Sequence, residues 1–70
     1  RSFKRAFGIS PVQYRIALQM REAERLLSVT DMPVREIALH LGYRDGYYFS
    51  RLFKRKCGVS PAHFRERTRP

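Results

Sequence analysis

The chain has 70 residues, with 15 Lys and Arg against 6 Asp and Glu, and a formal net charge of +9 at pH 7. A chain of this length buries only about 60% of its unfolded surface, so we expect one small domain with a thin core. The single cysteine excludes an internal disulfide. The content of 43% hydrophobic residues is too high for a disordered basic tail. No apolar run approaches the roughly 20 residues that span a bilayer.

Positive charge gathers at the two ends of the chain. Residues 1–15 carry four cations and no acid, residues 16–42 carry three cations and four acids, and residues 43–70 carry eight cations and two acids. This distribution favours a polyanionic partner. Charge alone leaves open that the cations simply form a solvated face.

The two ends also repeat one another. The segment Phe3–Arg15 recurs fifty positions later as Phe53–Arg65, which predicts two copies of one supersecondary unit. In each copy a glycine, Gly8 or Gly58, ends one helix, and a Ser-Pro pair starts the next. Because the second unit begins near Asp31, we expect the first unit to be truncated at its N-terminus.

In chain order, residues 1–9 are interpreted as the end of the first unit, a remnant of the helix that corresponds to residues 46–57 in the second unit and is described below as a recognition helix. The next helix runs from residue 11 to about 28, and residues 10–29 are interpreted as a linker helix between the units. Its predicted buried stripe, at helical spacing, consists of Val12, Ile16, Met20, Ala23 and Leu27. Tyr14 and Leu18 lie away from that stripe, so we expect the linker to pack on both sides.

Residues 30–70 are interpreted as a complete helix-turn-helix unit. Its first helix, residues 33–41, buries Val34, Ile37, Ala38 and Leu41 and leaves Leu39 on the opposite side. A turn containing Gly42 leads to Asp45, a good N-cap for a helix over residues 46–57. A last helix, residues 61–67, braces the unit through Phe64. The prediction is an all-α, homeodomain-like fold without strands.

The helix over residues 46–57 has two distinct faces. The predicted core face consists of Tyr48, Phe49, Leu52, Phe53 and Cys57. The opposite face carries Tyr47, Ser50, Arg51 and Lys54, with Arg55 at its margin. An apolar face opposite a basic, hydrogen-bonding face is typical of a recognition helix in the DNA major groove, although many basic helix faces are only solvated.

This interpretation assigns candidate DNA contacts. Arg51 is predicted to read guanine, while Tyr47 and Ser50 contact base edges. Arg44, Lys54 and Arg55 are predicted phosphate contacts. From the first unit, Arg1 and Lys4 are the candidate DNA contacts.

The residues of the second unit resemble the DNA-binding domain of the AraC/XylS family of bacterial transcription regulators. The matching positions are Ile37-Ala38, Gly42-Tyr43, Asp45, Tyr48-Phe49-Ser50-Arg51, Phe53-Lys54, Gly58, Ser60-Pro61 and Phe64-Arg65. The resemblance implies two helix-turn-helix units on a shared linker helix, which enter successive major grooves of double-stranded DNA. It also implies a cytoplasmic activator that can contact RNA polymerase.

Two positions depart from the family pattern. Gly46 stands where members often place a base-contacting side chain, so it receives no such role. Gln19 stands where many relatives have Arg, which predicts an altered contact with the first unit. Truncation of that unit also predicts self-association through exposed Phe3, Phe7 and Tyr14.

Other chemistry is not supported by the sequence. Cys57 corresponds to Phe7 in the repeat, so it is predicted to be a small core residue. His40 and His63 have no acidic or cysteine neighbours at metal-ligand spacing, and no catalytic residues, cofactor or membrane contact are expected. Two alternatives to specific DNA reading remain: a non-specific polyanion or RNA binder, and a protein-interaction module that contacts RNA polymerase.

Overall fold

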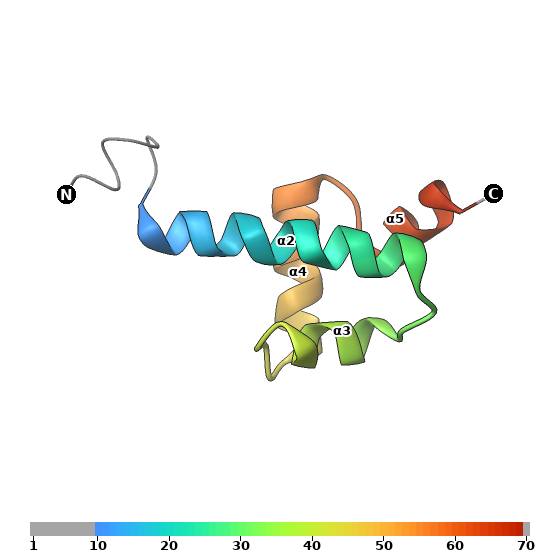
Figure 1. Cartoon of the computed structure of the whole chain (residues 1–70), viewed down its shortest axis with the longest axis horizontal. Coiled ribbons are helices and arrows are strands. Elements are labelled where there is room, and N and C mark those ends of the chain that lie inside the picture. Colours follow the sequence, from blue (N-terminus) through green and yellow to red (C-terminus); the bar gives the residue numbers. More distant parts are fainter. Residues whose placement is uncertain (1–9, 70) are drawn as a thin grey trace.

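A computed structural model describes residues 10–69 of the chain, and the predicted remnant at residues 1–9 lies outside this range. The described part contains four helices and no strand: α2 (Pro11–Val29), α3 (Val34–His40), α4 (Gly46–Cys57) and α5 (Pro61–Thr68) (Figure 1). The all-α prediction is confirmed. Every helix begins and ends within one or two residues of its predicted bounds.

Local hydrogen bonds explain where the helices begin. The backbone N–H of Gln13 donates to Ser10 Oγ at 3.1 Å, and the Ser10 N–H donates to Gln13 Oε1 at 3.2 Å, which completes a capping box. Ser60 accepts from the His63 N–H at 3.1 Å in the same way. Asp45 Oδ1 accepts from the N–H groups that open α4.

The turn between α3 and α4 is closed by backbone bonds around Gly42. The Gly42 N–H donates to the Leu39 carbonyl at 3.0 Å, and the Tyr43 N–H donates to the Ala38 carbonyl at 2.8 Å. This pair of bonds is a Schellman motif, which requires a left-handed residue at the glycine position. Gly42 has a φ of 99°, so a side chain here would be strained.

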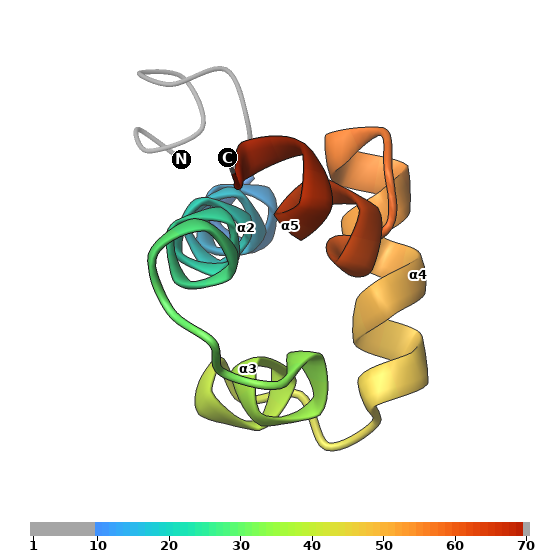
Figure 2. The same cartoon turned by 90° about the vertical axis from the view of Figure 1, so that its right-hand side faces the viewer.

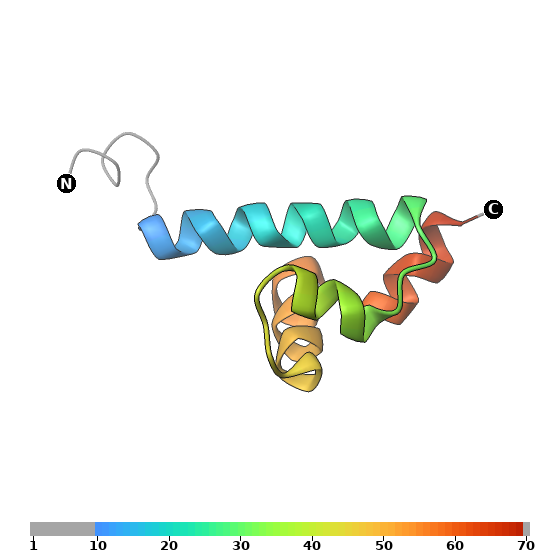
Figure 3. The same ribbon diagram turned by 60° about the horizontal axis from the view of Figure 1, so that its bottom comes forward.

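The four helices surround a small core. Figure 2 looks along α2 and shows α3 below it and α4 to its right, with α5 beside both α2 and α4. Figure 3 shows α2 extending beyond the other helices toward the N-terminus. The core consists of Met20, Ala23, Leu26, Leu27, Ile37, Ala38, Phe49, Leu52 and Phe53.

Two of the predicted core positions, Val12 and Tyr48, are wrong, and one buried residue, Leu26, was not predicted. Val12 was expected in the stripe of α2 but is 55% exposed, because that end of α2 extends beyond the other helices. Leu26 is buried instead, since the closely packed C-terminal half of α2 contacts α5. Tyr48 was expected in the core but is 53% exposed. It lies at the edge of the apolar stripe of α4, where helical spacing alone does not separate inside from outside.

Aromatic rings connect the turn, α4 and α5. The Tyr43 ring lies 5.4 Å from that of Phe49, Phe49 lies 6.0 Å from Phe53, and Phe53 lies 5.7 Å from Phe64. Tilted and edge-on arrangements at these distances are favourable for aromatic pairs. The predicted brace through Phe64 is therefore confirmed.

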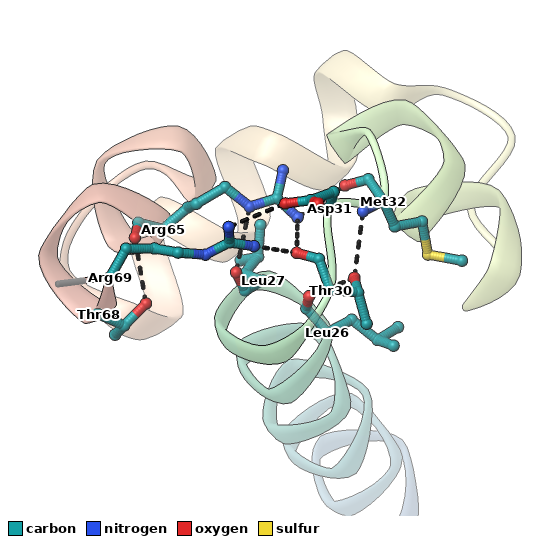
Figure 4. Close-up of polar contacts among 8 residues, drawn as sticks. All are labelled: Leu26, Leu27, Thr30, Asp31, Met32, Arg65, Thr68 and Arg69. Carbon is teal, nitrogen blue, oxygen red and sulfur yellow. Dashed lines mark hydrogen bonds and ion pairs between the residues drawn. The ribbon is translucent and has the colours of Figure 1, made fainter.

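Arg65 ties α5 to the segment that links α2 and α3 (Figure 4). Its Nε donates to the Leu27 carbonyl at 3.1 Å, and its Nη2 donates to the carbonyls of Thr30 and Met32 at 3.1 and 2.7 Å. The Leu27 carbonyl lies in the last turn of α2, where a carbonyl has no N–H partner within the helix. One half-buried guanidinium thus satisfies three carbonyls.

Arg69 adds a second contact to the same segment. It donates to the Thr30 carbonyl and forms an ion pair with Asp31 at 2.8 Å. The Arg69 guanidinium lowers the pKa of the Asp31 carboxyl. Because that carboxylate is almost fully exposed, the pair contributes little to stability.

Gln19 contacts the turn between α3 and α4. Its Nε2 donates to the Leu41 carbonyl at 2.9 Å, and its Oε1 accepts from the Tyr43 hydroxyl at 2.5 Å. The altered contact with the first unit stays a prediction, because residues 1–9 lie outside the described residues. Its side chain holds the α3–α4 turn against the middle of α2.

We predict that Phe53→Ala unfolds the domain at moderate temperature. Phe53 is fully buried, and removal of such a side chain costs about 3–5 kcal/mol in the free energy of unfolding. Thermal denaturation followed by circular dichroism measures this loss. Leu39→Ala is the matched control, since Leu39 is 57% exposed; an unchanged melting curve for Phe53→Ala would show that the assigned core is wrong.

We also predict that Arg65→Lys destabilises the chain by about 1–3 kcal/mol, because an ammonium cannot serve three carbonyls in the geometry of a guanidinium. Urea denaturation measures the change. Arg67→Lys is the control, because Arg67 is exposed on the same helix. Equal stability of the two variants would contradict a structural role for Arg65.

Candidate nucleic-acid interface

Helix α4 lies at one edge of the molecule, and no other helix covers its outer side (Figure 2). Tyr47 is 71% exposed, and Arg51, Lys54 and Arg55 are exposed with it. Phe49 and the other buried side chains of α4 point to the opposite side. The predicted division of α4 into two faces is thus present, apart from the position of Tyr48.

A groove of about 600 Å³ runs along this outer face. Its lining consists of Asp45, Tyr47, Tyr48, Arg51, Leu52, Lys54 and Arg55. Four of the predicted contact residues therefore share one concave surface. The groove is lined by three cations, Arg51, Lys54 and Arg55, against one acid, Asp45, so its rim is predominantly cationic.

A second groove of about 430 Å³ lies between α3 and the start of α4. Its lining consists of Val34, Arg35, Leu39, Arg44, Gly46, Tyr47 and Ser50. The predicted residues Arg44 and Ser50 belong to this groove, and Ser50 is only half-exposed. Tyr47 belongs to both grooves and so connects the two sets of predicted contacts.

Two residues of these grooves were missed by the sequence analysis. Tyr48 was assigned to the core, although its position at the stripe edge leaves its ring on the outer groove. Arg35 received no role, and its Cγ lies 3.8 Å from where a Cβ at Gly46 would stand. Only the packing of α3 against α4 brings Arg35 to the interface, so no local sequence signal indicates it.

The Arg51 side chain is already held by a neighbour. Its Cζ lies 5.8 Å from the centroid of the Tyr47 ring, within the range of a cation–π interaction. The two residues are four positions apart, so they stand on the same face of α4. Arg51 thus projects from the outer face with its guanidinium over an aromatic ring.

Other candidate sites can now be compared with the structure. Within residues 10–69, no His, Cys, Asp and Glu side chains gather as a metal site would require. Over the same range, no helix has both the length and the apolar character needed to cross a membrane. Arg1 and Lys4 lie outside the described residues.

The chain is similar to known proteins over most of its length. The family described as "Helix-turn-helix domain" matches residues 1–67. The MmsAB operon regulatory protein of Pseudomonas aeruginosa is 39% identical over 67 residues, and the arabinose operon regulatory protein of Escherichia coli is 40% identical over 63 residues. These alignments cover 96% and 90% of this chain, which spans only 22% of each relative.

Solved structures agree with the family match. The C-terminal domain of AraT, a response regulator from Geobacillus stearothermophilus, has a TM-score of 0.87 at 40% identity and is matched over 90% of this chain and 52% of that chain. The C-terminal domain of the response regulator yesN from Fusobacterium nucleatum has a TM-score of 0.86 at 34% identity, over 91% of this chain and 62% of that chain.

Cys57, which lies at the end of α4, is predicted to react slowly with thiol reagents. Burial and, after it, the Glu24 carboxylate raise the pKa of its thiol to about 11. An unfolded cysteine has a pKa of about 8.5, so between about pH 8.5 and pH 11 the thiol is protonated in the folded chain and ionised in the unfolded chain. The free energy of unfolding therefore falls as the pH rises through this range. At pH 8 we expect labelling at least roughly tenfold slower than in denaturing urea; equal rates would contradict this.

Proposed function

The chain belongs to the AraC/XylS-type family of helix-turn-helix regulators, and on this basis we propose that residues 10–69 read double-stranded DNA for a bacterial transcription regulator. The observation that carries the proposal is the outer face of α4. It presents Tyr47, Arg51, Lys54 and Arg55 along one open groove. A helix with such a face fits the width of the DNA major groove.

In this proposal three side chains contact base edges. Arg51 donates two hydrogen bonds to the O6 and N7 atoms of a guanine. Tyr47 and Ser50 contact the edges of neighbouring bases or the methyl group of a thymine. All three line the two grooves beside α4.

Three cations contact phosphates and hold α4 in register. Lys54 and Arg55 are exposed near the C-terminal end of α4, and Arg44 is exposed in the turn before it. The two ends of the helix would therefore each be anchored to the DNA backbone. Such contacts supply affinity without sequence information.

The linker role of residues 10–29 is part of the same proposal. A helix of 19 residues such as α2 is about 28 Å long, which is close to the roughly 34 Å of one DNA turn. Val12 and Leu18 are 55% and 48% exposed on α2. A first unit on that part of α2 would cover them and bring Arg1 and Lys4 to the neighbouring major groove.

A contact with RNA polymerase is a second candidate function. Leu39 is 57% exposed on α3, on the side away from the core and beside Arg35. An apolar side chain next to a cation suits a protein partner better than a phosphate backbone. Self-association through Phe3, Phe7 and Tyr14 is an alternative; Tyr14 is 36% exposed on α2, and Phe3 and Phe7 lie outside the described residues. The proposed location, in either case, is the bacterial cytoplasm.

Fluorescence anisotropy on matched DNA and RNA duplexes at two salt concentrations tests the proposed function. We expect salt-sensitive binding that clearly favours DNA, because the narrow major groove of A-form RNA excludes a helix. Equal binding to both duplexes would show that charge alone attracts the polyanion. No binding at low salt would favour the protein-interaction function.

We predict that Arg51→Ala weakens binding to a preferred DNA site by about 1–3 kcal/mol and relaxes the preference at one base pair. A site-selection experiment on random duplexes provides the preferred site, and anisotropy with single-base variants measures the loss. If Arg51→Ala weakens random and preferred DNA equally, Arg51 is a phosphate contact only.

We predict a different result for Lys54→Ala. Because phosphate contacts carry no sequence information, all duplexes should bind more weakly by the same factor, and the salt slope should fall by about one. Arg25→Ala is the matched control, since Arg25 pairs with Glu22 on α2 at 2.7 Å and lies outside both grooves. An unchanged slope for Lys54→Ala would exclude the phosphate contact.

A further inference from the structure

Tyr47 and Arg51 form a pair that the proposed function does not by itself require. Tyr47 could contact a base directly, as the sequence suggests, with Arg51 acting independently one turn later. In the structure, however, the Arg51 guanidinium lies over the Tyr47 ring, with 5.8 Å between Cζ and the ring centroid. The ring face toward Arg51 is therefore occupied before any DNA arrives.

The environment of Arg51 leaves its hydrogen-bond donors available. Within residues 10–69, Arg51 takes part in no ion pair. The one acid in its groove, Asp45, accepts from the backbone N–H groups of Tyr47 and Tyr48 instead. The ring thus holds the guanidinium through its face, while the N–H groups at its edge stay free to donate.

The contact with Tyr47 also sets the direction in which the Arg51 side chain points. Side chains on a helix lean toward its N-terminus, so the contact with Tyr47 draws Arg51 toward the first turns of α4. Those turns are the part of a recognition helix that contacts base edges. An exposed arginine otherwise samples many rotamers, and ordering it on binding costs conformational entropy.

We propose that Tyr47 is the positioning residue for Arg51: its ring holds the guanidinium in the orientation that donates to the O6 and N7 atoms of a guanine. The inference rests on the proposed function and deepens it. Tyr47 then raises the preference for guanine through Arg51, without reading that base itself. The aromatic ring is what the role requires, and the hydroxyl is dispensable.

Binding measurements on single-base variants of the selected DNA site test this role. At the base pair where Arg51→Ala abolishes the guanine preference, Tyr47→Leu should reduce that preference roughly two- to fivefold, as expected from an exposed cation–π contact. Tyr47→Phe should preserve it. When Arg51 is already alanine, Tyr47→Leu should have no further effect at that base pair.

Tyr48→Leu is the matched control. Tyr48 is an exposed tyrosine of the same groove, but its ring lies 6.1 Å from that of Tyr43. We expect Tyr48→Leu to leave the guanine preference intact. If Tyr47→Leu leaves the guanine preference at the Arg51 base pair unchanged, or still alters that base pair when Arg51 is alanine, the Tyr47 ring does not act through Arg51 and the inference is overturned.

A measurement on the free chain separates this inference from the proposed function. The Tyr47 ring current should shift the Nε–H signal of Arg51 in a ¹H–¹⁵N spectrum. This shift should persist in Tyr47→Phe and disappear in Tyr47→Leu. If the chain binds DNA specifically but the Arg51 signal has the same chemical shift in Tyr47→Leu, the inference alone is overturned. Failure to bind any duplex would overturn the proposed function, and the inference with it.

Discussion

The series of aromatic rings through the centre of the domain is the interaction on which the rest of the structure depends. Phe49 and Phe53 are fully buried, and their rings link Tyr43 in the turn to Phe64 on α5. A small domain has few other apolar side chains with which to fix the orientation of a helix. These rings hold one side of α4 inward, so its other side must face outward.

This constraint explains why the interface is built on α4. With Phe49 and Phe53 inside, helical geometry places Tyr47, Arg51 and Lys54 outside without any further interaction. Asp45 starts the helix, and Gly58, with a φ of 93°, ends it. The same residues that stabilise the fold therefore select which side chains reach a partner.

Local signals in the sequence were sufficient to predict the helices and their ends. Ser10, Asp45 and Ser60 form the predicted N-caps, and Gly42 and Gly58 have the left-handed backbone expected of helix-ending glycines. Each of these features depends on residues within five positions of one another. The predicted outer face of α4 follows from the same short-range periodicity.

The contacts between helices could not be predicted in this way. Arg65 reaches carbonyls more than thirty positions away, and Gln19 meets Tyr43 across 24 positions. Tyr48 is exposed because of how α4 meets its neighbours, although its place in the helix suits either side. Tertiary packing decides all three, and periodicity carries no information about it.

Taken together, these longer contacts hold α4 through both of its neighbours in sequence. Gln19 attaches the turn before α4 to the middle of α2, and Arg65 attaches the helix after α4 to the end of α2. The polar side chains thus act on the segments that flank α4, while the face of α4 itself stays free of ion pairs within residues 10–69. Because α4 is oriented from its two ends, its position does not depend on an ion pair of Arg51. The side chains that hold α4 in place are therefore different from those on its outer face. A binding surface requires this, because its own side chains must stay available to the bound molecule.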